Sequence, residues 1–268
     1  MHALCKSQYS RLKSNKKHGI AALLVSSLTF CINANAAGIS FSQYRIALDD
    51  QKRNTSLLVM NDGKLDSRCN IGFSHQQVQS DGSTKPVKAK KDIFNSADSM
   101  VRYSPRRVTI NSLSSQTVRL SLKRQKNQKK GEYVSYLKLS CRVDNKVSPT
   151  EGNLVAAQIH YNIPVVARVG KLSATANMSN AKMNDKNQLL FTMHRTGDRS
   201  LYGNTTVTDT STGKVIGRYN GVAMFLPVEQ QQFEVNLTEL PKGNLQIDFE
   251  ETAQFGGDQK ASMLFEIK

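Results

Sequence analysis

The side chains that most often carry catalysis or bind metals are few in this sequence and widely spaced. Beyond the amino-terminal segment, histidine occurs only at positions 75, 160 and 194, and none belongs to an HExxH or comparable metal-ligating spacing. No GxSxG sequence is present, which is the turn that carries the nucleophilic serine of many hydrolases. Glu250 and Glu251 are adjacent, so on a strand their carboxylates point to opposite faces. We therefore expect no enzyme, no metal site and no cofactor.

One short stretch, Ser211-Thr212-Gly213-Lys214, is faintly similar to a phosphate-binding loop. It lacks the first glycine of that motif, and no strand–loop–helix pattern surrounds it. We expect these residues to form a hairpin turn.

The first 36 residues are typical of a secretory signal peptide. Basic residues without any acid come first, an apolar run follows over residues 19–32, and Ala34-Asn35-Ala36 fits the small-residue cleavage pattern. We expect cleavage before Ala37 and export of the protein. An uncleaved membrane anchor is the alternative, but the run is shorter than the roughly 20 residues of a spanning helix.

Export also bears on the charge of the chain. Without the first 36 residues the formal net charge falls from +16 to +11, because five of the 37 basic residues and none of the 21 acidic ones are lost. A basic chain can indicate a nucleic-acid partner, but export of the protein argues against one.

Cys69 and Cys141 are the two cysteines that follow this segment. In an exported chain, two cysteines favour one disulfide. Closing a loop of about 70 residues stabilises a fold by roughly 4 kcal/mol in the chain-entropy model. The alternative, a reactive or metal-binding pair, has no CxxC spacing and no histidine cluster to support it.

Alternating apolar and polar residues dominate the rest of the chain, and helical periodicity is almost absent. About seven strands are expected before residue 170, which favours an immunoglobulin-like sandwich, and the pattern then restarts. We expect an all-β protein with mainly antiparallel sheets and two sandwich domains, at residues 37–169 and 170–268 after the 1–36 signal peptide. The expected strands cover 39–48, 55–60, 68–78, 100–103, 107–110, 116–123, 133–143 and 152–169, and then 171–177, 189–194, 205–210, 214–219, 222–226, 233–237, 245–250 and 263–267, with a loop or ragged edge at 79–97.

The last strand of the first set, within Gly152–Gly170, has an unusual pattern. Its apolar residues alternate until Pro164, which cannot donate a hydrogen bond to a sheet. Proline in a strand indicates an edge or a bulge, and an exposed edge can template pairing with another chain.

Several ordered segments are similar to those of a known family. They are the first strand Ser42–Leu48 with its arginine, the second strand Ser56–Asn61, Ser104-Pro105-Arg106-Arg107, Gln116–Leu120, Glu132-Tyr133, Ile163–Arg168, Arg195–Gly203 and Gly221–Phe225. Together with the signal peptide and the length, they resemble the periplasmic chaperones of chaperone–usher pilus assembly over the whole chain after residue 36. The last two segments are most similar to the archaic branch of that family.

The resemblance implies two immunoglobulin-like domains at an angle. It also implies that the chaperone lends its last first-domain strand to an incomplete pilus subunit, by donor-strand complementation, and delivers the subunit to an outer-membrane usher. The implied donor residues are Val155, Ala157, Ile159, Tyr161 and Ile163. The alternative is that this face packs only in the protein's own core.

The resemblance further implies that two basic residues bind the subunit's terminal carboxylate. The first maps onto Arg45, whereas the second, usually a lysine, aligns with Pro164. Arg119 and Arg107 are candidate substitutes, and Arg168 aligns with an arginine that braces the inter-domain interface. A self-capping homodimer through the exposed strand is a further expectation.

Two other functions stay open at this point. A secreted two-domain adhesin or pilus structural subunit is the main alternative. The expected first strand starts close to Ala37, which leaves little room for the amino-terminal extension of such a subunit. A carbohydrate- or metal-binding module is a third interpretation, which no specific residue supports.

Overall fold

The computed structural model describes residues 38–79, 81–87, 95–124, 126–143 and 158–267. Its described part is built almost entirely of strands, and none of its segments forms a helix long and apolar enough to cross a membrane. The one short helix among these residues is a 3-10 turn, η2 (Ala253–Phe255). The expected signal peptide, and the donor candidates Val155 and Ala157, lie outside the described residues.

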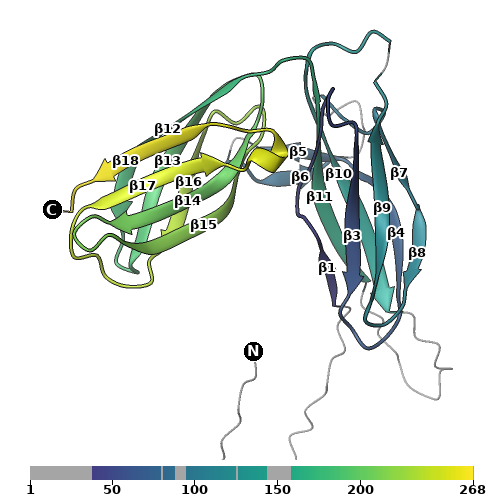
Figure 1. Cartoon of the computed structure of the whole chain (residues 1–268), viewed down its shortest axis with the longest axis horizontal. Coiled ribbons are helices and arrows are strands. Elements are labelled where there is room, and N and C mark those ends of the chain that lie inside the picture. Colours follow the sequence, from purple (N-terminus) through teal and green to yellow (C-terminus); the bar gives the residue numbers. More distant parts are fainter. Residues whose placement is uncertain (1–37, 80, 88–94, 125, 144–157, 268) are drawn as a thin grey trace, which may run out of the picture. The chain divides into compact units, whose positions relative to one another are not determined.

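The strands up to residue 169 form a first sandwich of two sheets (Figure 1). The four-stranded sheet has the order β1 (Ile39–Phe41), β3 (Asn54–Asn61), β9 (Ser114–Leu122) and β7 (Val101–Ser104). The five-stranded sheet has the order β2 (Ile46–Leu48), β11 (Gln158–Val169), β10 (Gly131–Val143), β4 (Ser67–Ser74) and β8 (Arg107–Ile110). The alternating apolar residues of both sheets meet in one core, which includes Leu57, Val118 and Leu139.

The remaining strands form a second sandwich with its own core, which includes Phe191, Val207 and Ile247. Its three-stranded sheet has the order β12 (Ala174–Met183), β13 (Gln188–Gly197) and β16 (Gln230–Asn236). Its four-stranded sheet has the order β15 (Lys214–Met224), β14 (Leu201–Asp209), β17 (Leu245–Glu251) and β18 (Lys260–Phe265). The prediction of two all-β, immunoglobulin-like sandwiches is confirmed.

The expected first strand, residues 39–48, is in fact two strands. β1 pairs antiparallel with β3 at the edge of the four-stranded sheet, and β2 pairs with β11 at the edge of the five-stranded sheet. The chain changes sheets between Phe41 and Ile46. The pairing of β2 with β11 is parallel, whereas every other pairing between described strands is antiparallel.

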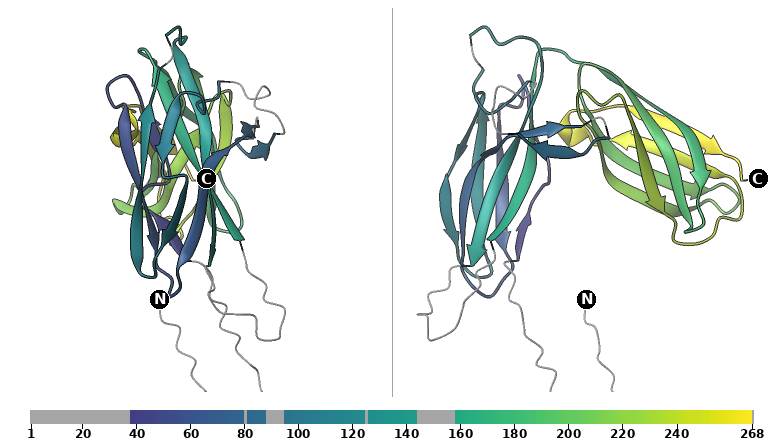
Figure 2. Two further views of the ribbon diagram at one scale, coloured as in Figure 1. Left: turned by 90° about the vertical axis from the view of Figure 1, so that its right-hand side faces the viewer. Right: turned by 180° about the vertical axis from the view of Figure 1, so that it is seen from behind.

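Other boundaries also differ from the expectation, and the expected strand 68–78 is divided into β4 and β5 (Gln76–Val78) of different sheets. The segment 79–97 was expected to be a loop or a ragged edge, and it contains β6 (Thr84–Pro86), which pairs with β5 in a short hairpin that stands out from the sheets (Figure 2). The expected strands 214–219 and 222–226 are one strand, β15, because Gly221 adopts a positive φ of 81° at an irregular register instead of ending the strand. Strand β14 begins at Leu201, four residues before the expected start at residue 205.

Cys69 and Cys141 form the expected disulfide. They are direct cross-strand partners on β4 and β10, and both are fully buried in the first core. The bond therefore joins the strand next to β11 to the rest of the five-stranded sheet.

Candidate functional site

The outer edge of β11 is paired along only part of its length. β10 pairs with β11 from Gln158 to Val169, but β2 pairs with the opposite edge only from Val165 to Ala167. No other described strand bonds to β11. The stretch from Gln158 to Pro164 therefore presents an edge whose backbone groups can accept another strand.

The two faces of this open stretch differ in chemistry. On one face the rings of Tyr161 and Phe41 meet edge to face, with 5.0 Å between their centroids. Ile159 and Tyr161 are half-buried against the first core, whereas Ile163 is only 3% exposed and belongs to that core. On the other face, His160 Nδ1 and Ser140 Oγ are 2.9 Å apart. The apolar candidates therefore share one face, and their burial increases toward Pro164.

Pro164 lies at the centre of a row of three residues. Tyr136 of β10 is its direct cross-strand partner. On the other side, Ile46 pairs with Val165 in parallel register, and continuing this register by one residue places Arg45 beside Pro164. Arg45, Pro164 and Tyr136 are not part of the first core, whereas the residues that flank Pro164 on β11, Ile163 and Val165, are. They therefore share the outer face of the five-stranded sheet.

Residues of the second sandwich bury this outer face. The Arg45 side chain has no exposed surface, and its Nη2 donates a hydrogen bond to Ser200 Oγ at 2.7 Å. The guanidinium carbon of Arg45 lies 4.8 Å from the ring centroids of both Tyr202 and Phe225. The aromatic faces thus stabilise the cation in a site that excludes water.

The charge of Arg45 is nevertheless poorly compensated. Its Nε and Nη1 have no hydrogen-bond partner among the described residues. Burial lowers the pKa of Arg45 to about 10, although the nearby carboxylate of Glu132 acts in the opposite direction. An unpartnered buried cation costs free energy, so this position favours an added anion.

Glu132 does not satisfy Arg45, because Arg168 holds it. Arg168 Nε donates to Glu132 Oε2 at 2.9 Å, and the Ser200 backbone N–H donates to Oε1 at 3.0 Å. Arg168 also donates to the carbonyl oxygens of Phe255, Gly256 and Ser200, at 3.0, 2.9 and 3.3 Å. Arg168 thus forms hydrogen bonds with residues of both sandwiches.

The structure does not bring Arg107 or Arg119 to this site. Arg107 begins β8, at the opposite edge of the five-stranded sheet from β2, with three strands between them. Arg119 is exposed on β9 of the other sheet, where it lines a hollow of about 650 Å³ with Arg102 and Tyr103. Arg45 therefore has neither of these two bases as a second anchor.

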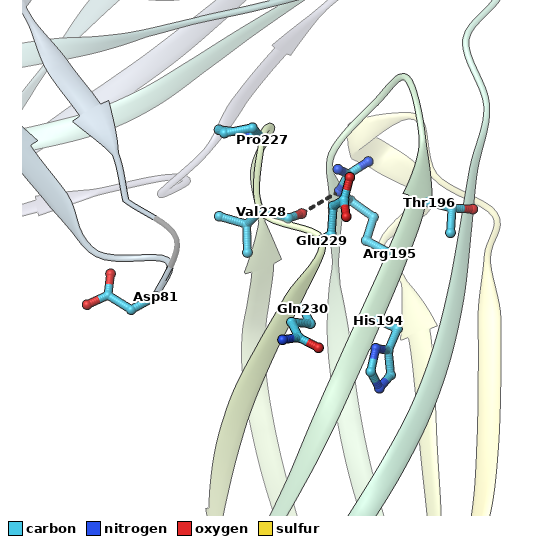
Figure 3. Close-up of a pocket in the computed structure, with 8 residues that line it drawn as sticks. All are labelled: Asp81, His194, Arg195, Thr196, Pro227, Val228, Glu229 and Gln230. Atoms are coloured by element: carbon cyan, nitrogen blue, oxygen red, sulfur yellow. Dashed lines mark hydrogen bonds between the residues drawn. The ribbon is translucent and has the colours of Figure 1, made fainter.

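A larger hollow, of about 820 Å³, lies beside strands β13 and β16 (Figure 3). Its arginine, Arg195, is held by backbone carbonyls, since Nε donates to Val228 O at 2.8 Å and Nη1 donates to Gly197 O at 2.9 Å. His194 Nε2 is 2.7 Å from Ser179 Oγ. No group of three or more metal-ligating side chains occurs among the described residues. The residues around this hollow are thus bonded within the fold.

Sequence reasoning missed the residues that surround Arg45. In β10, Tyr136 alternates with the core residues, so it lies on the same outer face as Glu132. A large aromatic ring on this otherwise polar face could have indicated that another part of the protein covers it. Ser200, Tyr202 and Phe225 lie in segments that were noted only for their resemblance to the archaic branch. Their contacts with Arg45 depend on how distant strands pack, which spacing alone does not predict.

No protein-family model matches the sequence, and no curated protein matches it significantly. Solved structures do match. The YadV chaperone has a TM-score of 0.47 and 11% identity, and the match covers 85% of this chain and 99% of that one. The SafA pilin–SafB chaperone complex of Salmonella enterica gives a TM-score of 0.46 and 13% identity, with 87% and 97% covered.

A third match is a complex from archaic chaperone–usher Csu pili of Acinetobacter baumannii, in which the CsuC chaperone is assembled with the CsuE tip adhesion subunit. Its TM-score is 0.45 and its identity 14%, and the match covers 86% of this chain and 98% of that one. All three structures contain a chaperone, the class of protein that the sequence motifs resemble.

Proposed function

We propose that this protein is a periplasmic chaperone that binds pilus subunits by donor-strand complementation and delivers them to an outer-membrane usher. The observation that carries the proposal is the open edge of β11 from Gln158 to Pro164. Its backbone groups can bond to a subunit strand, and its alternating apolar side chains can enter the groove of an incomplete sandwich. The proposal includes export through a cleaved signal peptide at residues 1–36.

The domain division of the proposal follows the sheets. In this proposal, residues 37–169 carry the donor strand and residues 170–268 form the second domain, since among the described residues no sheet contains strands from both sides of Gly170. Within the donor strand, Ile159 and Tyr161 are the described residues best suited to enter a subunit, because they are only half-buried. Ile163 supports the strand from the core, and Val155 and Ala157 are donor candidates from the sequence alone.

Arg45 is the proposed binding residue for the subunit's terminal carboxylate. It is a buried cation with two unpartnered nitrogen atoms, and a carboxylate can accept charge-assisted hydrogen bonds from them. We assign Arg168 to the contact between the two domains. A homodimer in which two open β11 edges pair in the absence of subunit follows from the same geometry.

Co-expression with a small exported β-protein encoded beside this chain tests the proposal. We expect a 1:1 complex that survives purification. Arg45→Ala should lose the subunit, because it removes the charged anchor, while circular dichroism shows an unchanged fold. Ile159→Asp should also lose it, because a carboxylate on the apolar face opposes entry into an apolar groove.

His160→Asp is the matched control, since it places the same charge on the opposite face of the same strand. We expect His160→Asp to retain the complex. Equal capture by the Ile159 and His160 variants would contradict the donor-strand role. Finding the protein itself in purified surface fibres, and no complex on co-expression, would favour the adhesin or structural-subunit alternative.

A further inference from the structure

Three buried hydrogen-bond donors near one another lack partners among the residues that the structure describes. Arg45 contributes Nε and Nη1, and the third is the phenolic hydroxyl of Tyr136. The Tyr136 side chain is buried, with 6% of the residue exposed, and Arg45 has no exposed surface. Buried donors are nearly always bonded in folded proteins, so a group of three without partners calls for an acceptor.

The strand register explains why these donors lie together. Arg45 and Tyr136 flank Pro164 on the same face, so their backbones are roughly 10 Å apart, or two strand spacings. Both side chains are long enough to extend over the small ring of Pro164. The Phe225 ring adjoins both, with its centroid 4.8 Å from the guanidinium carbon of Arg45 and 6.4 Å from the Tyr136 ring centroid.

We propose that Tyr136 is the second anchor of the carboxylate site, in place of the basic residue that the sequence lacks at Pro164. This inference rests on the proposed function, because the carboxylate is that of the bound subunit. The hydroxyl of Tyr136 donates one hydrogen bond to the carboxylate, and Arg45 supplies the charge and further N–H donors. The site thus pairs one cation with one neutral donor.

The electrostatics favour a monoanion in this site. Burial raises the pKa of Tyr136 to about 12, with the nearby Arg45 cation acting in the opposite direction, so the phenol keeps its proton at neutral pH and can donate it. The single charge of Arg45 balances one carboxylate. A second cation at position 164 would leave the site with an excess positive charge, because Glu132 already pairs with Arg168.

Access to the site requires movement of a covering side chain. Since Arg45 is fully buried, a carboxylate reaches it only after such a side chain is displaced. Phe225 contacts both anchors and follows directly after the end of β15, so its ring is the candidate for this movement.

A titration of the purified protein with N-acetylglycine tests the inference, with N-acetylglycinamide as the uncharged counterpart. The Arg45 Nε–Hε signal is followed by NMR and is assigned by its loss in Arg45→Lys. We expect it to shift with the acid and not with the amide. Tyr136→Phe should weaken acid binding roughly tenfold or more, the loss of one hydrogen bond to a charged group.

Tyr44→Phe is the matched control, because Tyr44 is 66% exposed and should leave the affinity unchanged. The urea midpoint separates binding from structure. The Tyr136 hydroxyl has no partner to lose, so Tyr136→Phe should be at least as stable as the wild type. A lower midpoint would show a structural role and overturn the inference.

Two binding results also decide the matter. Equal affinity of Tyr136→Phe and wild type for the acid overturns the role of Tyr136, and absence of any acid-specific shift overturns the site itself. The chaperone function is judged separately by the co-expression complex. If that complex fails to form while Tyr136→Phe weakens acid binding as expected, only the proposed function is refuted.

Discussion

Replacing Glu132 with glutamine should destabilise the protein far more than a single exposed charge would. The Glu132 side chain is fully buried and accepts two hydrogen bonds, from Arg168 Nε and from the Ser200 backbone N–H. A glutamine side chain retains one acceptor oxygen but presents an amide N–H₂ to the other donor. The substitution therefore removes the countercharge of Arg168 and leaves one buried donor unpaired.

The magnitude follows from what Arg168 retains. Removing one partner of a buried ion pair costs about 3–5 kcal/mol. Arg168 still donates to three carbonyl oxygens, and its side chain is 10% exposed, so we expect a loss near the lower end of this range. Arg45 adds to the loss, because Glu132 is the carboxylate that favours its charged form.

Urea unfolding followed by far-UV circular dichroism measures this loss, since the chain contains no tryptophan for fluorescence. Glu250→Gln is the control, because the Glu250–Lys260 pair has side chains 66% and 71% exposed and should contribute about 1 kcal/mol or less. A double-mutant cycle with Arg168→Met should show strong coupling to Glu132. Equal losses for Glu132→Gln and Glu250→Gln would refute the reasoning.

Two further predictions concern stability. Replacing Cys69 and Cys141 together with alanine should lower the free energy of unfolding by about 4 kcal/mol in the chain-entropy model, for a sequence separation of 72 residues; a urea midpoint equal to that of the oxidised wild type would contradict this. Glu251 is buried, which would raise its pKa, but the bonds from Arg199 and from the Gln259 N–H lower the pKa below the usual 4.5. The stability from this group is therefore present above about pH 4.5 and is lost as the pH falls through the lower folded-state pKa. Thermal midpoints should fall less steeply with acid in Glu251→Gln, and parallel curves would show that other groups cause the loss.

Local patterns in the sequence were enough to predict much of the fold. Alternation indicated most strands, and the parity of β10 placed Cys141 on the buried face with Leu137 and Leu139. The division of residues 39–48 could not be predicted in this way, because both halves are apolar and alternate. The change of sheet depends on two different partners, β3 and β11, that lie far along the chain.

The candidate site was predicted in part. Arg45 was identified through its resemblance to a family position, and its burial among second-sandwich residues agrees with a special role. Arg107 and Arg119 were chosen on charge and position, but the sheet order separates them from Arg45. Tyr136 was not considered, because its closeness to Arg45 depends on two strand pairings. Tyr136 lies opposite Pro164 in the pairing of β10 with β11, and Arg45 lies beside Pro164 in the pairing of β2 with β11. Neither pairing can be predicted from local sequence patterns.

The short strand β2 also limits how another chain can bind. It occupies the outer edge of β11 from Val165 onward, directly after Pro164. A strand that joins the open edge can therefore extend in one direction only until it meets β2. The described part of that edge, Gln158 to Pro164, spans roughly 23 Å at 3.3 Å per residue. If the proposed function is correct, partners with different side chains should all end their added strands at the same point, beside Arg45.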